Sequence, residues 1–123
     1  MKFQEEAIPG LGLLMALATA DGPLQPQEQD VLLTFLAALR SELGVEPDRQ
    51  EDEDLIAEFE EWAATAKSIQ DNASQLYAAV HARTIFPRFF ASMGVADGIP
   101  NDKERIMIGR IHAAMRSVCK SAG

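Results

Sequence analysis

The chain has 123 residues, of which 47% are hydrophobic and 24% charged, and its formal net charge is −8. This length and composition are typical of one soluble globular domain, and they exclude wholesale disorder and fibrous repeats. The negative charge disfavours nucleic acid as a partner and favours a cation or a basic protein face. We therefore expect a single domain over residues 1–123 with a protein partner, and a homodimer stays open.

Helix-forming residues dominate and no alternating strand pattern persists, so we predict an all-α protein. The first helix is expected over 9–20, where a proline suits the first turn and Asp21-Gly22 the end. Its apolar run is too short to span a bilayer, and the acidic residues before it are wrong for a signal peptide. We expect a buried helix and no membrane insertion. The second helix is predicted over 26–43, ended by Gly44.

The third helix is predicted over 54–68, where apolar residues recur at helical spacing. A fourth helix is expected to begin at Asp71 or Asn72, because both residue types are good N-caps. Leu76 and Val80 are predicted to point into the core from this helix. The acids that precede and begin the third helix are interpreted as a solvated face.

Pro87 predicts a break or kink over 83–87, because proline removes a backbone donor from a helix. A fifth helix is then expected to reach Ala96, and the last helix to follow Asn101 and run to about Lys120. The predicted architecture is a compact bundle of about six to seven helices.

Neither the histidines nor the cysteine predicts a catalytic site. His81 and His112 lie on or beside apolar helical stripes, which favours buried or half-buried structural imidazoles. Cys119 is the only cysteine, so no intrachain disulfide can form, which suits a reducing, cytoplasmic setting. We expect its thiol to be exposed and inert.

A repeated motif is the most informative feature of the sequence. Ala20-Asp21-Gly22 is followed by five residues and Glu28, and Ala96-Asp97-Gly98 by five residues and Glu104, with both acids offset by 76 positions. Each copy reads as a helix, an Asp-Gly turn and a second helix. We therefore predict an internal pseudo-twofold repeat of two hairpins, over roughly 9–44 and 72–120, joined by the acidic segment 45–70.

The chemistry of these turns leaves alternatives open. The glutamates suit helix N-termini, so capping explains them without any ligand. The aspartates follow helix C-termini, where negative charge is unfavourable, and two nearby acids are costly unless a cation neutralises them. Such oxygen ligands suit Ca²⁺, Mg²⁺ or Mn²⁺. A metal site, a structural adaptor with caps only, and a less favoured acid/base hydrolase are the hypotheses.

The doubled Ala-Asp-Gly-x5-Glu motif in a small, acidic, helical chain resembles the tellurite-resistance TerB-like family. That family is similar in fold to the N-terminal domain of a DnaJ-type membrane co-chaperone. The resemblance implies a bundle of about seven helices and divalent-cation binding by Asp21, Glu28, Asp97 and Glu104. It also implies a non-enzymatic role in a stress-response or membrane-linked protein complex.

Overall fold

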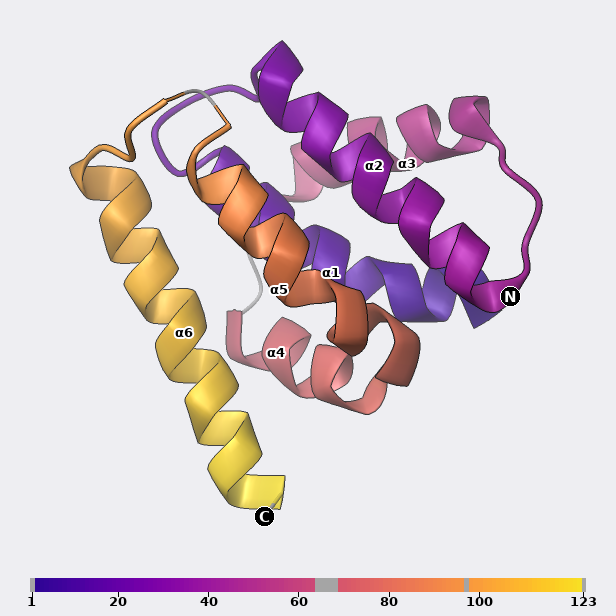
Figure 1. The fold of residues 1–123 in the computed structure, drawn as a ribbon. Coiled ribbons are helices and arrows are strands. Elements are labelled where there is room, and N and C mark those ends of the chain that lie inside the picture. The colour runs from indigo at the N-terminus through magenta and orange to yellow at the C-terminus, as the bar shows by residue number, and fades with distance from the viewer. Residues whose placement is uncertain (1, 64–68, 97, 123) are drawn as a thin grey trace.

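The computed structural model describes residues 2–63, 69–96 and 98–122, and these ranges hold six helices and no strand (Figure 1). The helices are α1 Lys2–Ala18, α2 Pro26–Leu43, α3 Arg49–Ala63, α4 Ile69–Ala78, α5 Val80–Gly94 and α6 Asp102–Ala122. The prediction of an all-α bundle is confirmed. No helix in the described ranges combines the length and the apolar character needed to cross a membrane.

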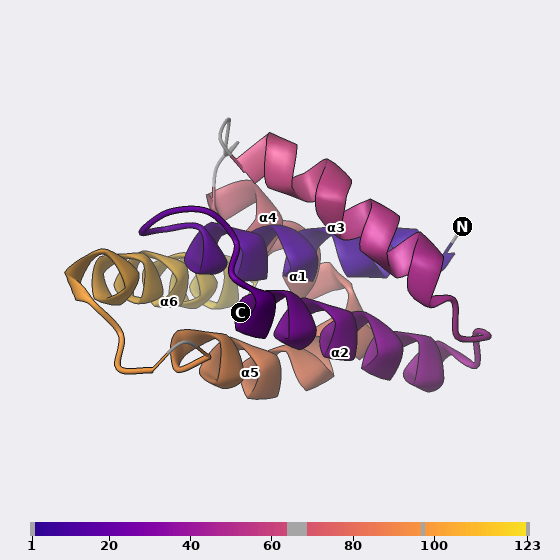
Figure 2. The same ribbon diagram turned by 90° about the horizontal axis from the view of Figure 1, so that it is seen from above.

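Helix α1 is the centre of the bundle and contacts all five other helices (Figures 1 and 2). Phe3, Ala7, Leu11 and Leu14 follow one another at helical spacing, and all are almost completely buried. Further buried side chains lie on its other sides, so α1 is apolar nearly all round, as a helix enclosed by its neighbours must be. The core therefore forms around the N-terminal helix.

Two proline-based predictions are wrong, wholly or in part. Helix α1 begins at Lys2, well before residue 9, because Phe3 and Ala7 extend its buried face, and Pro9 lies inside the helix. Helix α5 runs through Pro87, which is exposed, so the predicted break over 83–87 is absent, while a kink there stays a prediction. Val80 opens this helix and is 56% exposed, which corrects its predicted place in the core.

Other predicted boundaries had mixed outcomes. Helix α2 has the predicted bounds and α6 begins where Asn101 predicted it. Helix α3 begins five residues before the predicted start, because the Asp48 carboxylate accepts the Glu51 backbone N–H at 3.0 Å and caps it. The predicted end of that helix, over 64–68, lies outside the described residues. His112 is exposed with its ring edge-on to Phe90, so its predicted burial is wrong.

Close packing of α1 on α2 depends on Gly10, and replacing it with alanine should lower the free energy of unfolding by about 1–3 kcal/mol. A Cβ there would lie 2.7 Å from Cζ of Phe35, a buried ring held edge-on against Phe89. Gly109→Ala on α6 is the matched control, since its Cβ would meet nothing within 4 Å. That change should instead stabilise by up to about 1 kcal/mol. Urea unfolding of both variants checks the contrast, and equal effects would contradict it.

Candidate metal centre

The two predicted turns lie at the same end of the bundle, in the α1–α2 and α5–α6 connections (Figure 1). Each contains a glycine with positive φ, 150° at Gly22 and 117° at Gly98, a region that L side chains rarely adopt. Asn101 Nδ2 donates a hydrogen bond of 2.6 Å to Asp21 Oδ2 and so joins the turns. A twofold relation between the whole halves stays a prediction.

Each turn is followed by a glutamate that caps its own helix. Glu28 Oε1 accepts the backbone N–H of Gln25 at 2.8 Å, and Glu104 Oε1 accepts that of Asn101 at 3.1 Å. Asn101 Oδ1 in turn accepts the backbone N–H of Glu104 at 2.9 Å, which completes a capping box at α6. Both glutamates are 1% exposed. Two helix N-termini, each favourable for negative charge, therefore hold two buried carboxylates in place.

The three described acids form one compact cluster. One carboxylate oxygen each from Asp21, Glu28 and Glu104 lie within 4.8 Å of one another. Oxygens on opposite sides of a Ca²⁺ ion are at most about 5 Å apart, since each Ca–O distance is about 2.3–2.6 Å. The cluster is therefore of a size that could hold one hard cation.

One atom of this cluster is not explained by capping. Glu104 Oε2 is buried and has no hydrogen-bond partner in the described part of the chain, while Oε1 makes the cap. A buried carboxylate oxygen without a partner is costly. Repulsion among three nearby carboxylates adds to that cost, and a cation bound among them would remove both penalties.

The structure brings together three of the four residues singled out in the sequence. Asp21, Glu28 and Glu104 converge, whereas Asp97 lies outside the described residues. Asn101 was predicted only as a helix cap, yet its amide also reaches Asp21. No local sequence pattern reveals a contact between residues 80 positions apart. The one signal in the sequence was that Asn101 is a polar side chain close to the second turn.

A second buried charged group lies far from this cluster, between α2 and α3. The Arg40 guanidinium donates to Asp52 Oδ1 from Nη2 at 2.9 Å and to the Glu46 carbonyl from Nη1 at 2.9 Å. It also lies 4.1 Å from the centre of the Phe3 ring. Burial lowers the pKa of Arg40, but the hydrogen bond and charge of Asp52, with Glu51, hold it above its usual value. Asp52 is 4% exposed, so the interpretation of this acidic run as a solvated face does not hold for Asp52.

A third buried group connects α1 to the start of α5. Glu6 Oε1 accepts the backbone N–H groups of His81 and Ala82 at 2.9 and 3.3 Å, and Oε2 lies 2.9 Å from His81 Nδ1. Burial raises the pKa of Glu6, but these hydrogen bonds together outweigh it and hold the pKa below its usual value. His81 is half-buried and structural, as predicted.

Comparison with known proteins supports the family resemblance of the motif. The family model described as "Tellurite resistance protein TerB" matches residues 7–117. Neither the curated proteins nor the solved structures gave a significant match. The matched segment includes both Asp-Gly turns and every residue of the acidic cluster.

Proposed function

Because the chain belongs to the tellurite resistance protein TerB family, we propose that it is a non-enzymatic domain that binds a divalent cation. The proposed ligands are Asp21, Glu28 and Glu104, with Asp97 as a further candidate from the sequence. The observation that carries the proposal is the buried Glu104 Oε2, which has no hydrogen-bond partner in the described residues and belongs to a cluster of three carboxylates.

The donor set favours a hard cation. Only carboxylate oxygens are offered by the cluster, and such oxygens suit Ca²⁺, Mg²⁺ or Mn²⁺ better than soft metals. Since Asp21 lies in the α1–α2 connection and Glu104 at the start of α6, a bound cation would link the α1–α2 connection to the N-terminus of α6. We propose that this cation-stabilised end acts in a stress-response protein complex of the cytoplasm.

Millimolar Ca²⁺, Mg²⁺ or Mn²⁺ should raise the melting temperature. A ligand that binds only the folded state at ten times its dissociation constant stabilises it by about 1.4 kcal/mol. In a domain of this size that is a rise of roughly 4 °C. Thermal unfolding followed by circular dichroism, with titration calorimetry to measure the binding itself, checks this expectation.

The variant Asp21→Asn, Glu104→Gln should lose the rise, because the amides keep the hydrogen-bonding shape but remove two ligand charges. Without added cation it should be at least as stable as the original chain, since carboxylate repulsion is relieved. Asp30→Asn, Glu42→Gln removes the same charge from exposed positions of α2 and should keep the rise. An unchanged melting temperature with all three cations would refute the proposal.

The alternative function is a structural adaptor in which the acids only cap helices and no metal binds. The observation that favours it is the pair of capping hydrogen bonds made by Glu28 and Glu104. Because a glutamine at this position can also accept the capping hydrogen bond, this hypothesis predicts that the stability difference between Glu104→Gln and the original chain is the same at every cation concentration. The metal hypothesis predicts that this difference grows as cation is added, so the same titration separates the two functions.

A further inference from the structure

Asn101, which precedes α6, forms hydrogen bonds with two of the three clustered acids. Its backbone N–H donates to Glu104 Oε1 at 3.1 Å, and its side-chain Oδ1 accepts the backbone N–H of Glu104 at 2.9 Å. Its side-chain Nδ2 donates to Asp21 Oδ2 at 2.6 Å. Gln25 holds the corresponding place before α2, but its amide donates to the Pro23 carbonyl at 3.2 Å and not to an acid. The two copies of the motif therefore differ in what their capping side chain contacts.

The orientation of the Asn101 amide follows from these contacts. Its oxygen must face the Glu104 N–H, because an amide nitrogen cannot accept a hydrogen bond. The NH₂ group then faces Asp21, whose carboxylate can only accept. Turning the amide over would place an oxygen against the carboxylate and a donor against the Glu104 N–H. The helix cap and the contact with Asp21 therefore reinforce each other.

Asp21 is the member of the cluster that burial does not fix. It is exposed, whereas Glu28 and Glu104 are each 1% exposed. Within the described ranges its carboxylate makes no hydrogen bond other than the one from Asn101, and no ion pair. The position of this carboxylate beside the two glutamates therefore depends on the Asn101 amide.

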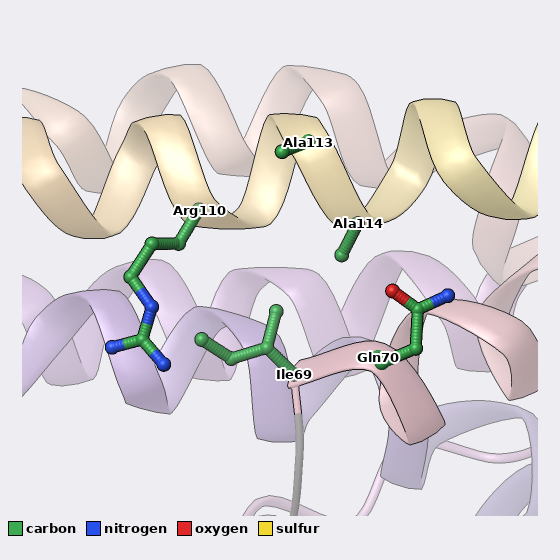
Figure 3. Close-up of a pocket in the computed structure, with 5 residues that line it drawn as sticks. All are labelled: Ile69, Gln70, Arg110, Ala113 and Ala114. Atoms are coloured by element: carbon green, nitrogen blue, oxygen red, sulfur yellow. The ribbon is translucent and has the colours of Figure 1, made fainter.

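The group that holds Asp21 is neutral, which leaves the negative charge of the carboxylate available to a cation. A lysine or arginine in the place of Asn101 would pair with Asp21 and compete with a bound cation. The basic residues of α6 do not take this role. Arg110, for example, extends toward Ile69 at the start of α4, where it borders a groove between the two helices (Figure 3). Asp21 is thus held in place without being neutralised.

We propose that Asn101 is a positioning residue for the cation site, an inference that rests on the proposed function. It holds the Asp21 carboxylate in the cluster before a cation arrives, so binding has less side-chain freedom to remove. It also holds Glu104 Oε1 in the cap, which leaves the buried Oε2 as the oxygen that faces a cation. One side chain therefore sets the geometry of two ligands that come from distant parts of the sequence.

The variant Asn101→Ser tests this role, because serine caps a helix about as well as asparagine but its short side chain cannot reach Asp21. Ca²⁺, Mg²⁺ and Mn²⁺ are each titrated by calorimetry, and the dissociation constants should rise about three- to tenfold, as expected for the loss of one hydrogen bond. The melting temperature without cation should stay within about 2 °C, because the cap remains and Asp21 can move away from the other carboxylates. Gln25→Ser is the matched control and should leave the dissociation constants unchanged, since the Gln25 amide contacts no acid.

The outcomes separate this inference from the proposed function. If the original chain binds a cation and Asn101→Ser binds it equally well, or if Gln25→Ser weakens binding as much, the role of Asn101 is overturned and the cation site stands. An equal fall in melting temperature with and without cation would overturn the role as well, because Asn101 would then act only as a cap. If the original chain binds none of the three cations, the proposed function fails and this inference fails with it.

Discussion

Replacing Arg40 with methionine should lower the free energy of unfolding by about 3–5 kcal/mol, because it leaves the Asp52 carboxylate buried without its partner. Arg40 and Asp52 are 3% and 4% exposed, so water cannot take over the lost hydrogen bonds. The Glu46 carbonyl would lose its donor as well. Urea unfolding at neutral pH measures the difference, and an unchanged m-value would show that the folded state stays compact.

Two further variants isolate the cause. Arg40→Met combined with Asp52→Leu should recover most of the loss, since an apolar pair in place of a buried ion pair is often neutral or stabilising. Arg49→Met removes an exposed pair with Glu53, whose side chains are 74% and 39% exposed, and should cost less than about 1 kcal/mol. If Arg40→Met costs no more than Arg49→Met, the buried pair does not stabilise α2 against α3.

Glu6→Ala should cost about 2–3 kcal/mol, because it removes an acceptor from two backbone N–H groups at the start of α5. The loss is limited because His81 is half-buried, so water can replace part of the contact. Glu5→Ala, one residue earlier and exposed, should change stability by less than about 0.5 kcal/mol. Urea unfolding of the two variants at pH 7 gives the comparison.

The contribution of Glu6 should depend on pH in a defined direction. Its pKa is lowered on folding from the ordinary value of 4.5, so the folded state binds this proton less readily than the unfolded state does. The stabilisation is therefore complete above that ordinary value and is lost as pH falls through the folded-state pKa. The difference in stability between the original chain and Glu6→Ala should shrink between pH 5 and pH 3, and a constant difference would contradict this origin.

Local signals in the sequence predicted most of the helices. Gln25-Pro26 and Gly44 enclose α2, and Asn101 marks the start of α6, because caps and left-handed glycines act over only a few residues. Proline misled the prediction twice, since tertiary burial of Phe3 and Ala7 outweighed the local cost at Pro9. The helix ends were thus predictable where the deciding interaction was itself local.

Part of the candidate metal site could be predicted because its sequence signal is also local. A repeated spacing identified Asp21, Glu28 and Glu104, but it could not show that Asn101 hydrogen-bonds to Asp21. Arg40 with Asp52 and Glu6 with His81 were missed because each pair joins different helices. Such pairings depend on how helices are placed in space, which no local pattern encodes.

The central place of α1 has a consequence for the apparent division of the chain into two hairpins. Since α1 contacts every other helix, the second hairpin, α5–α6, buries part of its apolar surface on a helix that belongs to the first. Neither hairpin should then be an autonomous folding unit. The whole chain is therefore expected to unfold in one cooperative transition, with no half-folded intermediate. A peptide of either hairpin alone is expected to stay unfolded.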